Sequence, residues 1–254
     1  MLLLGTHLVF QLTPSLKRCW LGGEPEISIN ICPYLVSRGI KGGIRGEGMM
    51  PSRFLYICIC STHSQTLLTM ACPDTVTLKN LTGKHRLNKG LSDGIDETLK
   101  LQGVGYLKRT AIANFSLTLE FSQHTDDGIE HIDIKQTLSG GFKAPTENIV
   151  MDGEEHPKND DLFGPLIGQT RRVKVDELDI DFLKEEWTED TLEDGVIYGV
   201  VKSDTEKTGK DWVIHLVWGF TIKEGVRKFA RRYRFTTKER SEPIDVKLYY
   251  DYVE

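Results

Sequence analysis

The chain has 254 residues, with 32 Lys and Arg against 37 Asp and Glu and a formal net charge of −5. That length allows one domain with an extension, and the apolar and charged fractions of 39% and 27% are those of an ordinary globular chain. The charge is uneven: residues 1–69 hold six basic and three acidic residues, and the rest of the chain has a net charge of −8. Because nucleic-acid binding requires a basic surface, we expect no nucleic-acid partner.

Residues 1–69 contain no pattern that continues into the rest of the chain. The apolar run 2–12 is too short to span a bilayer, and the basic pair Lys17-Arg18 follows it, which is the wrong order for a secretory signal. Met70-Ala71-Cys72-Pro73 is a natural start for a folded domain. We therefore predict a disordered or non-native extension at 1–69, a domain at 73–254, a cytoplasmic location and no stable membrane insertion.

No cysteine follows Cys72, so the predicted domain has no disulfide framework, no cysteine nucleophile and no zinc–thiolate site. Phosphate loops, dinucleotide fingerprints, nucleophile elbows and paired-histidine motifs are also absent from the sequence. We predict that the protein uses neither a cofactor nor a metal ion.

The stretch 81–114 predicts a short strand at 84–88 followed by two short helices. Ser92 and Asp93 are suited to cap the first helix, and Ile95 and Leu99 share one of its faces because they are four residues apart. Gly103 lies where the end of a helix favours a residue with positive φ. The second helix has an apolar stripe of its own, formed by Val104, Leu107 and Ala111.

From residue 114 onwards the hydrophobic period is two, which indicates strands. Turn signals at Asp126-Asp127-Gly128 and Lys223-Glu224-Gly225 join neighbouring strands into hairpins. We predict a polar loop at 154–161 and a short amphipathic helix in the acidic segment 177–195. The predicted strands span 115–121, 131–138, 146–151, 166–175, 196–202, 212–222, 227–236 and 246–253. With the first strand and less regular segments, about nine or ten antiparallel strands close a small barrel, and the helix-turn-helix forms its lid.

The strand 227–236 places an arginine among aromatic residues. Phe229, Arg231, Tyr233 and Phe235 share one face by alternation, and Arg232 lies on the other. A buried guanidinium is costly unless it is paired or meets a ligand oxygen. Arg231 is therefore a candidate anchor for an anion or carbonyl group, with Tyr233 as a hydrogen-bond donor beside it. A solvated or internally salt-bridged arginine is the alternative, and Trp212 and Trp218 of the preceding strand are either cavity walls or core.

Several of these residues resemble a known family. Gly83-x-His85-x-Leu87, Asp96-Glu97, Leu101-Gln102-Gly103-Val104-Gly105 and Arg109 resemble the opening of the intracellular fatty-acid-binding proteins of the calycin superfamily, although His85 replaces that family's tryptophan. Arg231-Arg232-Tyr233 resembles the family's R-x-Y, whose Arg and Tyr hold a ligand carboxylate. Beyond Asn148 the spacing is longer than in that family, and the chain looks closer to lipocalin-like fungal proteins of secondary metabolism, some of which are cofactor-free cyclases.

The resemblance implies an all-β, calycin-like antiparallel barrel whose interior binds a hydrophobic small molecule. It implies a cofactor-free cyclase or isomerase, similar to a Diels–Alderase, acting on an apolar biosynthetic intermediate, with Arg231 and Tyr233 as catalytic residues. The expected ligand-binding residues are Trp212, Trp218, Phe229, Phe235 and Leu107. The alternative is an intracellular carrier of a fatty acid or similar ligand, since both functions need a dry cavity and one polar anchor.

Overall fold

The structure, a computed structural model, describes residues 71–140, 142–143 and 145–253. The predicted extension at 1–69 lies outside the described residues. The strands are β1 (Gly83–Leu87), β2 (Leu117–Asp126), β3 (Ile129–Leu138), β4 (Phe142–Lys143), β5 (Glu147–Val150), β6 (His156–Asp160), β7 (Gly164–Val173), β8 (Val196–Ser203), β9 (Trp212–Lys223), β10 (Val226–Thr237) and β11 (Arg240–Val253). The helical elements are α1 (Ile95–Leu101), α2 (Tyr106–Asn114), the 3-10 turns η2 (Val175–Glu177) and η3 (Asp181–Leu183), α3 (Glu189–Asp194) and α4 (Thr205–Thr208).

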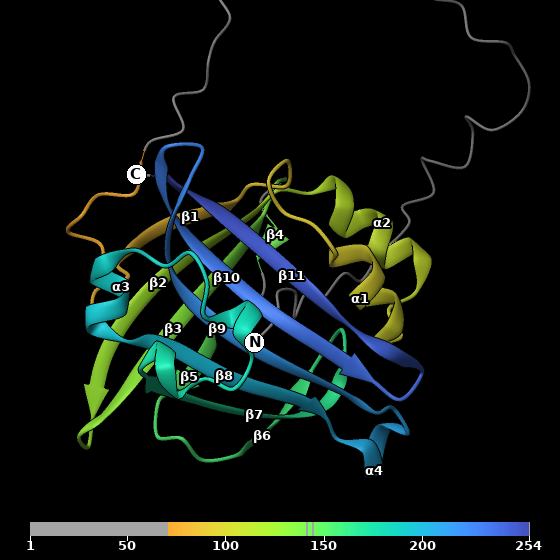
Figure 1. Cartoon of the computed structure of the whole chain (residues 1–254). Coiled ribbons are helices and arrows are strands. Elements are labelled where there is room, and N and C mark those ends of the chain that lie inside the picture. The colour runs from red at the N-terminus through yellow and green to blue at the C-terminus, as the bar shows by residue number, and fades with distance from the viewer. Residues whose placement is uncertain (1–70, 141, 144, 254) are drawn as a thin grey trace, which may run out of the picture. The chain divides into compact units, whose positions relative to one another are not determined.

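These strands form one antiparallel sheet in the order β4-β3-β2-β1-β11-β10-β9-β8-β7-β6, with β5 also paired to β3 (Figure 1). The first strand pairs with both β2 and the last strand, β11, so the sheet curls back on itself. Within the described part of the chain no ladder joins β5 to β6, but Lys158 Nζ on β6 donates to the Asn148 carbonyl on β5 at 3.0 Å. The prediction of an all-β, calycin-like fold with a helix-turn-helix after the first strand is confirmed.

Two predicted hairpins form at the expected residues. Asp127 and Gly128 have φ angles of 47° and 80°, and Glu224 and Gly225 have φ angles of 52° and 74°. Positive φ at both central residues matches the right-handed twist of the strands they join. The turn at Asp127 and Gly128 sets the register of β2 and β3, and the turn at Glu224 and Gly225 sets that of β9 and β10.

Two local predictions are wrong. The predicted loop at 154–161 contains β6, whose one partner strand among the described residues is β7. It therefore lies at the sheet edge, where polar residues replace the usual hydrophobic alternation. The predicted helix in 177–195 is broken into η2, η3 and α3, and Glu186, with a φ of 58°, interrupts it. The apolar residues of this segment are nevertheless buried: Leu178, Leu183 and Trp187 belong to a hydrophobic cluster with strand residues such as Val196 and Val217.

The segment 174–195 covers the outside of the sheet and buries Arg232, which we expected to face outward. Arg232 is 0% exposed, and its Nη1 and Nη2 donate to the Glu185 carbonyl and the Glu186 carboxylate at 2.6 and 2.5 Å. Its Cζ lies 4.7 Å from the centre of the Trp187 ring. Alternation correctly assigned Arg232 to the outer face, but that face has a second hydrophobic cluster, formed by Val173, Leu178, Leu183, Trp187, Val196, Val217, Ala230 and Tyr249.

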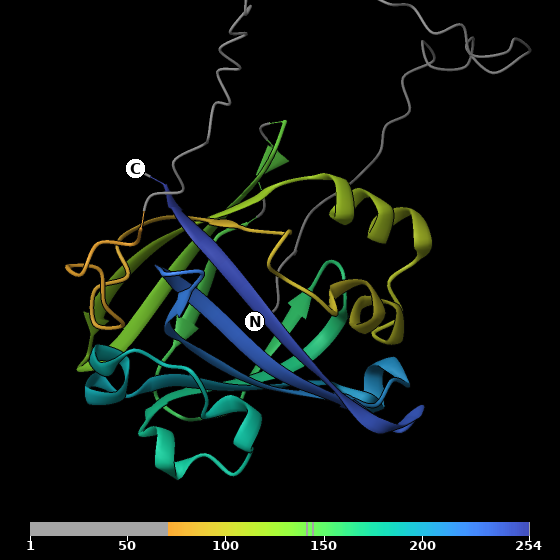
Figure 2. The same cartoon turned by 45° about the horizontal axis from the view of Figure 1, so that its top comes forward.

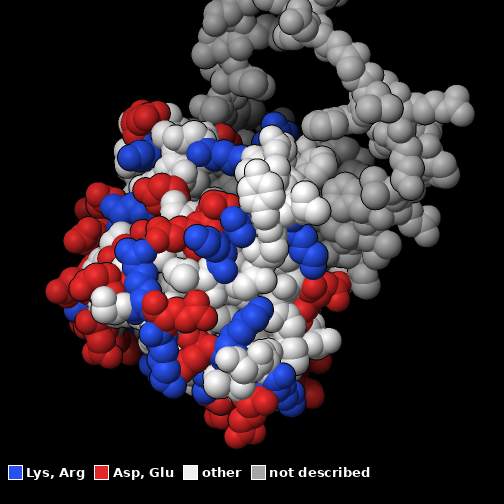
Figure 3. Space-filling view, turned by 90° about the vertical axis from the view of Figure 1, so that its right-hand side faces the viewer, with Lys and Arg blue, Asp and Glu red and all other residues white. Residues whose placement is uncertain are grey.

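The two ends of the barrel are closed differently. Helices α1 and α2 lie at the end where β2 begins, on the right of Figures 1 and 2. At the other end of β2, Gln123 Nε2 donates to the Leu78 carbonyl at 3.0 Å, and Val76, Leu78 and Leu81 belong to the interior cluster. The segment before β1 is thus part of the core. The face that carries the lid helices has Lys, Arg, Asp and Glu interspersed around an uncharged stripe (Figure 3).

None of the helices in the described ranges is long and apolar enough to cross a membrane.

Candidate active site

A cavity of about 310 Å³ lies between the lid and the adjoining strands β1, β2 and β3. Ile95 and Leu99 contribute one wall, as their four-residue spacing predicted. The lining is largely apolar with a few charged residues: Leu87, Lys89, Ser92, Asp93, Gly94, Ile95, Asp96, Leu99, Arg109, Ile112, Ala113, Phe115, Leu117 and Leu138. This volume is at the lower end of the range for small-molecule sites.

The charged residues of the cavity hold the lid in place. Lys89 Nζ donates to the carbonyls of Ile112 and Ala113 at 2.8 and 2.7 Å, and so satisfies carbonyl groups in the last turns of α2. Burial lowers the pKa of Lys89. Arg109 donates to Asp96 at 2.9 Å and to the Val104 carbonyl at 2.9 Å, which ties α2 to α1 and to the segment between the helices.

The first lid helix begins differently from the prediction. Its N-cap is Gly94, with a φ of 68°, and no side chain caps it. Ser92 Oγ instead accepts a bond from the Tyr249 amide at 3.1 Å, and Asp93 Oδ1 accepts one from the Lys247 amide at 3.3 Å. Both predicted caps therefore bind the last strand. Their short polar side chains were recognised correctly, but tertiary contact with β11 decided which amides they bind.

Arg231 lies inside the barrel, enclosed by aromatic rings. Its Cζ is 4.1 Å from the centre of the Trp218 ring and 5.6, 5.7 and 5.7 Å from those of Phe121, Phe229 and Tyr250. The side chain is fully buried, and its Nε and Nη2 have no hydrogen-bond partner among the described residues. Burial lowers the pKa of Arg231, and nearby Tyr250 and Glu147 partly oppose this lowering. Among the described residues neither nitrogen meets an acceptor with good hydrogen-bond geometry, but the Tyr250 hydroxyl lies near enough to raise the pKa of Arg231 through a hydrogen bond. A ligand oxygen would therefore share this edge of the guanidinium with Tyr250.

Two buried residues near Arg231 were not among the predicted site residues. The ring of Tyr250 lies 5.4 Å from that of Phe229 and is tilted by 47° to it. Burial raises the pKa of the Tyr250 hydroxyl, while the charge of Arg231 opposes that rise. The imidazole of His85 lies 5.1 Å from Phe229 and 5.4 Å from Phe121, and burial lowers its pKa to about 4. His85 is therefore a neutral group of the interior at physiological pH.

Tyr233 also faces the interior, but it contacts the lid. Its hydroxyl lies 3.0 Å from Thr98 Oγ1 on α1, and burial raises its pKa. The phenol beside Arg231 is therefore that of Tyr250, and Tyr233 connects the floor of the barrel to the lid.

Four of the five predicted ligand-binding residues, Trp212, Trp218, Phe229 and Phe235, belong to the interior cluster. None of them lines the cavity of about 310 Å³. Leu107 is different, because it is 79% exposed and lies on the outer side of α2, which buries none of its own residues. Of the apolar stripe from which Leu107 was predicted, Val104 is buried in the interior cluster, whereas Leu107 is not. Arg109 and Ile112 line the cavity beneath the lid, and Leu107 borders a separate, more open hollow together with Val104 and Leu162.

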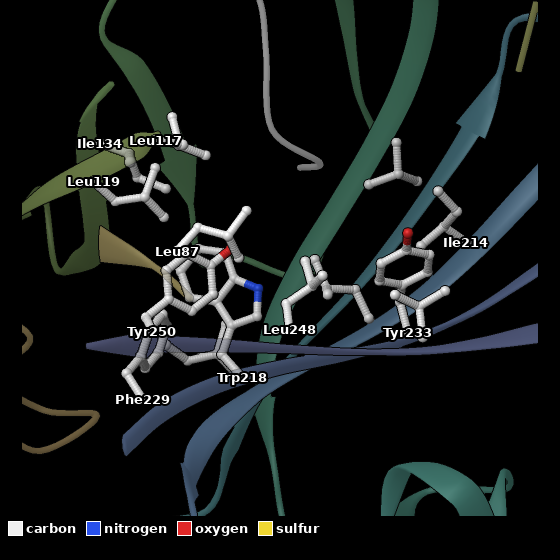
Figure 4. Packing of buried hydrophobic residues seen from close by; sticks show 14 of the residues in the cluster. Leu87, Leu117, Leu119, Ile134, Ile214, Trp218, Phe229, Tyr233, Leu248 and Tyr250 are labelled. Carbon is white, nitrogen blue, oxygen red and sulfur yellow. The ribbon is translucent and has the colours of Figure 1, made fainter. Parts of the chain in front are cut away.

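Leu87 connects the cavity to the Arg231 cluster. It lines the cavity, and it is the cross-strand neighbour of Tyr250 in the β1–β11 ladder. In Figure 4 the side chains of Leu87, Tyr250, Phe229 and Trp218 lie together, Tyr233 lies apart from them beside Ile214, and Leu248 lies between the two groups. The interior thus has an apolar cavity beneath the lid and, behind Leu87, a cluster of buried polar groups among aromatic rings.

The described residues include no group of three or more His, Cys, Asp and Glu side chains that could hold a metal ion. No protein-family model matches the chain.

Comparison with known proteins identifies a family. The chain is 30% identical over 187 residues to the probable pericyclase scpY of Mollisia scopiformis. The matched region covers 72% of this chain and 95% of that protein. This chain belongs to the pericyclase family. The pericyclase pydY of an Acremonium species is 25% identical over 186 residues, covering 72% of this chain and 97% of that protein.

Two solved structures similar to this pericyclase-family chain are lipid-binding proteins. They are the lipid binding protein 8 of Caenorhabditis elegans (TM-score 0.47, 15% identity, 70% of this chain and 98% of that one) and the fatty-acid-binding protein of Manduca sexta (TM-score 0.40, 16% identity, 67% and 97%). At this level of similarity they carry no functional information.

The sequence of this pericyclase-family protein indicated Arg231 and two of the four rings around it, Trp218 and Phe229, but not Phe121 or Tyr250. Tyr250 lies on β11, whose expected strand began at residue 246, and alternation alone does not say which of several tyrosines approaches Arg231. His85 was predicted only to replace the family's tryptophan and was not placed in the site. A histidine in that otherwise apolar position was the available signal that the interior is polar at this point.

Proposed function

We propose that this protein catalyses a pericyclic cyclisation of an apolar intermediate in secondary metabolism, without a cofactor. The relation to scpY over 95% of its length supports the reaction class. The observation that carries the proposal for this site is the buried guanidinium of Arg231, whose Nε and Nη2 have no hydrogen-bond partner among the described residues. Such donors in a dry interior suit a group that carries negative charge in the transition state.

A pericyclic reaction moves its electrons around one ring of atoms, so it needs no nucleophile and no proton transfer. The catalyst can contribute by holding the chain in the reactive fold, which removes part of the entropic barrier. It can also bind a carbonyl conjugated to the reacting double bond and stabilise the charge that grows on its oxygen. The apolar walls around Leu87, Ile95 and Leu99 supply the first effect and Arg231 the second.

Each side chain has a defined role in this proposal. Arg231 donates to the substrate carbonyl, and Tyr250 lies beside it as a second donor. Trp218 and Phe229 form flat walls against which a polyene stacks, and Trp212 and Phe235 extend that wall toward Tyr233. Substrate enters beneath α2, and Leu87, between the cavity and the Arg231 cluster, must move for the carbonyl to reach the guanidinium.

Product analysis with a linear polyene that carries an α,β-unsaturated carbonyl tests the proposal. The protein should accelerate formation of the cyclised isomer, of unchanged mass, above its spontaneous rate. Arg231→Met should reduce the acceleration about ten- to a hundredfold, because a charge-assisted hydrogen bond contributes roughly 1.5–3 kcal/mol. Arg234→Met is the matched control, since Arg234 pairs with Asp245 at the surface. A polyene bound tightly and returned unaltered would favour the carrier function instead.

A hydrophobic small molecule is therefore the proposed partner of the barrel. The cytoplasmic location and the lack of a nucleic-acid partner remain predictions.

A further inference from the structure

Two histidines, His124 on β2 and His131 on β3, lie side by side on the outside of the barrel. They are direct partners in the β2–β3 ladder, on the opposite face from Phe121 and Ile132 of the interior cluster. Their ring centres are 5.2 Å apart, and the two ring planes differ by 13°. Side chains that can both become positively charged are unfavourable at directly opposite positions of a sheet. The pair therefore calls for an explanation other than packing.

Each imidazole is held at its Nδ1 by a group that accepts a hydrogen bond. Asn148, on β5, donates from Nδ2 to Asp133 Oδ1 at 2.8 Å, and its Oδ1 lies 3.3 Å from His131 Nδ1. Because a carboxylate only accepts, the amide nitrogen must face Asp133 and the amide oxygen must face His131, so His131 Nδ1 carries the hydrogen. Asp133 Oδ2 lies 3.5 Å from His124 Nδ1 and favours a hydrogen there as well.

This arrangement leaves the lone pair of both neutral rings on Nε2. An imidazole nitrogen with a free lone pair is a preferred ligand of Zn²⁺, Ni²⁺ and Cu²⁺. A hydrogen bond from the other ring nitrogen to a carboxylate or carbonyl oxygen is the usual way in which a metal-binding histidine is oriented.

The spacing of the two rings also suits a shared ion. Two imidazoles that bind one ion at about 2.0 Å and a tetrahedral angle have ring centres roughly 5 Å apart. The observed distance between the ring centres of His124 and His131 is 5.2 Å. The nearly parallel rings need only turn about their side-chain torsions for both lone pairs to meet at one point, and the side chain of His124, which is 47% exposed, has room to do so.

We propose that His124 and His131 bind one divalent transition-metal ion, such as Zn²⁺ or Ni²⁺, through their Nε2 atoms, with water in the remaining positions. Asp133 and Asn148 are positioning residues, which hold the rings from behind. With two protein ligands the site differs from structural and catalytic zinc sites, which have three or four. It links β2, β3 and β5, so an ion bound there stabilises this part of the sheet. The site is separate from the proposed function, whose reaction uses no metal ion.

Isothermal titration calorimetry of the full chain with Ni²⁺–iminodiacetate, a complex that keeps positions open for imidazoles, tests the inference. The wild-type protein should bind the complex, and His124→Gln and His131→Gln should each weaken binding about tenfold or more, because chelation by two linked ligands is lost. Asp133→Asn should weaken it about tenfold while both ligands remain. His156→Gln is the matched control, since His156 Nε2 is already bonded to Asp152 at 2.9 Å.

Thermal melts check that the variants are folded and give a second readout. The complex should raise the melting temperature of the wild type but not that of His124→Gln. If His124→Gln were unfolded, His131→Gln would decide. No binding by the wild type, unchanged affinity in the histidine variants of the pair, or an equal loss in His156→Gln would each overturn the inference.

Discussion

Two consecutive arginines, Arg231 and Arg232, are both buried but differ in what surrounds them. Arg231 has two nitrogens without partners inside the barrel, whereas Arg232 has a carboxylate and a carbonyl on the outside. Replacing an unsatisfied buried cation by apolar volume is often neutral or stabilising, so we expect Arg231→Met to leave the free energy of unfolding unchanged or raise it. Arg232→Met should lower it by about 1–3 kcal/mol, because two charge-assisted hydrogen bonds are lost.

Equilibrium urea unfolding of the two variants, together with cyclisation assays, checks this difference. Arg232→Met should keep the activity of the folded protein. If instead Arg231→Met were the destabilised variant and kept its activity, the proposed anchor would be a structural residue.

His85 gives the protein a pH dependence. The pKa of this histidine falls from 6.5 to about 4 on folding, because burial disfavours the charged form. Between these values the unfolded chain binds more protons, so stability is full above pH 6.5 and decreases as the pH falls toward 4. At 1.36 kcal/mol per pH unit the loss is roughly 3 kcal/mol. His85→Phe, which fits among the same aromatic rings, should remove that part of the pH dependence when unfolding is measured from pH 7 to 4. An identical slope in both proteins would contradict it.

At the scale of elements, the lid depends on how α1 ends. Gly103 has a φ of 84°, and a Cβ there would collide with Lys210 Nζ. We expect Gly103→Ala to cost about 1 kcal/mol or more of unfolding free energy, from the left-handed backbone and the displaced lysine. Binding of a hydrophobic probe beneath the lid should weaken as well.

Gly105 provides the control for this variant, because its φ is −62° and no atom lies within 4 Å of the Cβ position. Gly105→Ala should be close to neutral, since the reduced freedom of the unfolded chain offsets the loss of a preferred N-cap residue. Equal urea midpoints for the two variants would mean that the positive φ of Gly103 is not costly for alanine.

At the scale of the whole molecule, we predict that a chain starting at Met70 folds as well as the full chain. The described sheet and its core begin with the segment after that residue, and the Cys72 amide donates to the Arg227 carbonyl at 3.0 Å. A chain starting at Gly83 should not fold, because it lacks Val76, Leu78 and Leu81 of the interior cluster. Each such side chain contributes roughly 1.5–3 kcal/mol, and together they approach the total stability of a domain.

Thermal melts and far-ultraviolet circular dichroism of the three chains test this prediction. An insoluble chain from Met70 would make residues 1–69 part of the fold, and a stable chain from Gly83 would show that the segment before β1 is dispensable.

Local patterns were enough to predict the architecture of this protein. Alternation placed Arg231 on the same face as Phe229 and Tyr233, and the family resemblance placed that face inside the barrel. Turn residues such as Asp127 and Gly128 marked the hairpins, and Gly103 marked the end of a helix. These features depend on a residue and its neighbours along the chain. Alternation predicts a face but not what covers it, which is why Arg232 was expected to be exposed and is buried by the segment 174–195.

Only the tertiary structure decided which side chains meet. The pairing of β1 with β11 places Leu87 beside Tyr250, although they are far apart in the sequence, and the curl of the sheet encloses Arg231 in four aromatic rings. It also left Leu107 on the outside of the lid, because α2 turns Arg109 and Ile112 toward the cavity instead. Side-chain contacts across a barrel are set by the register and curvature of many strands together, and no single stretch of sequence contains that information.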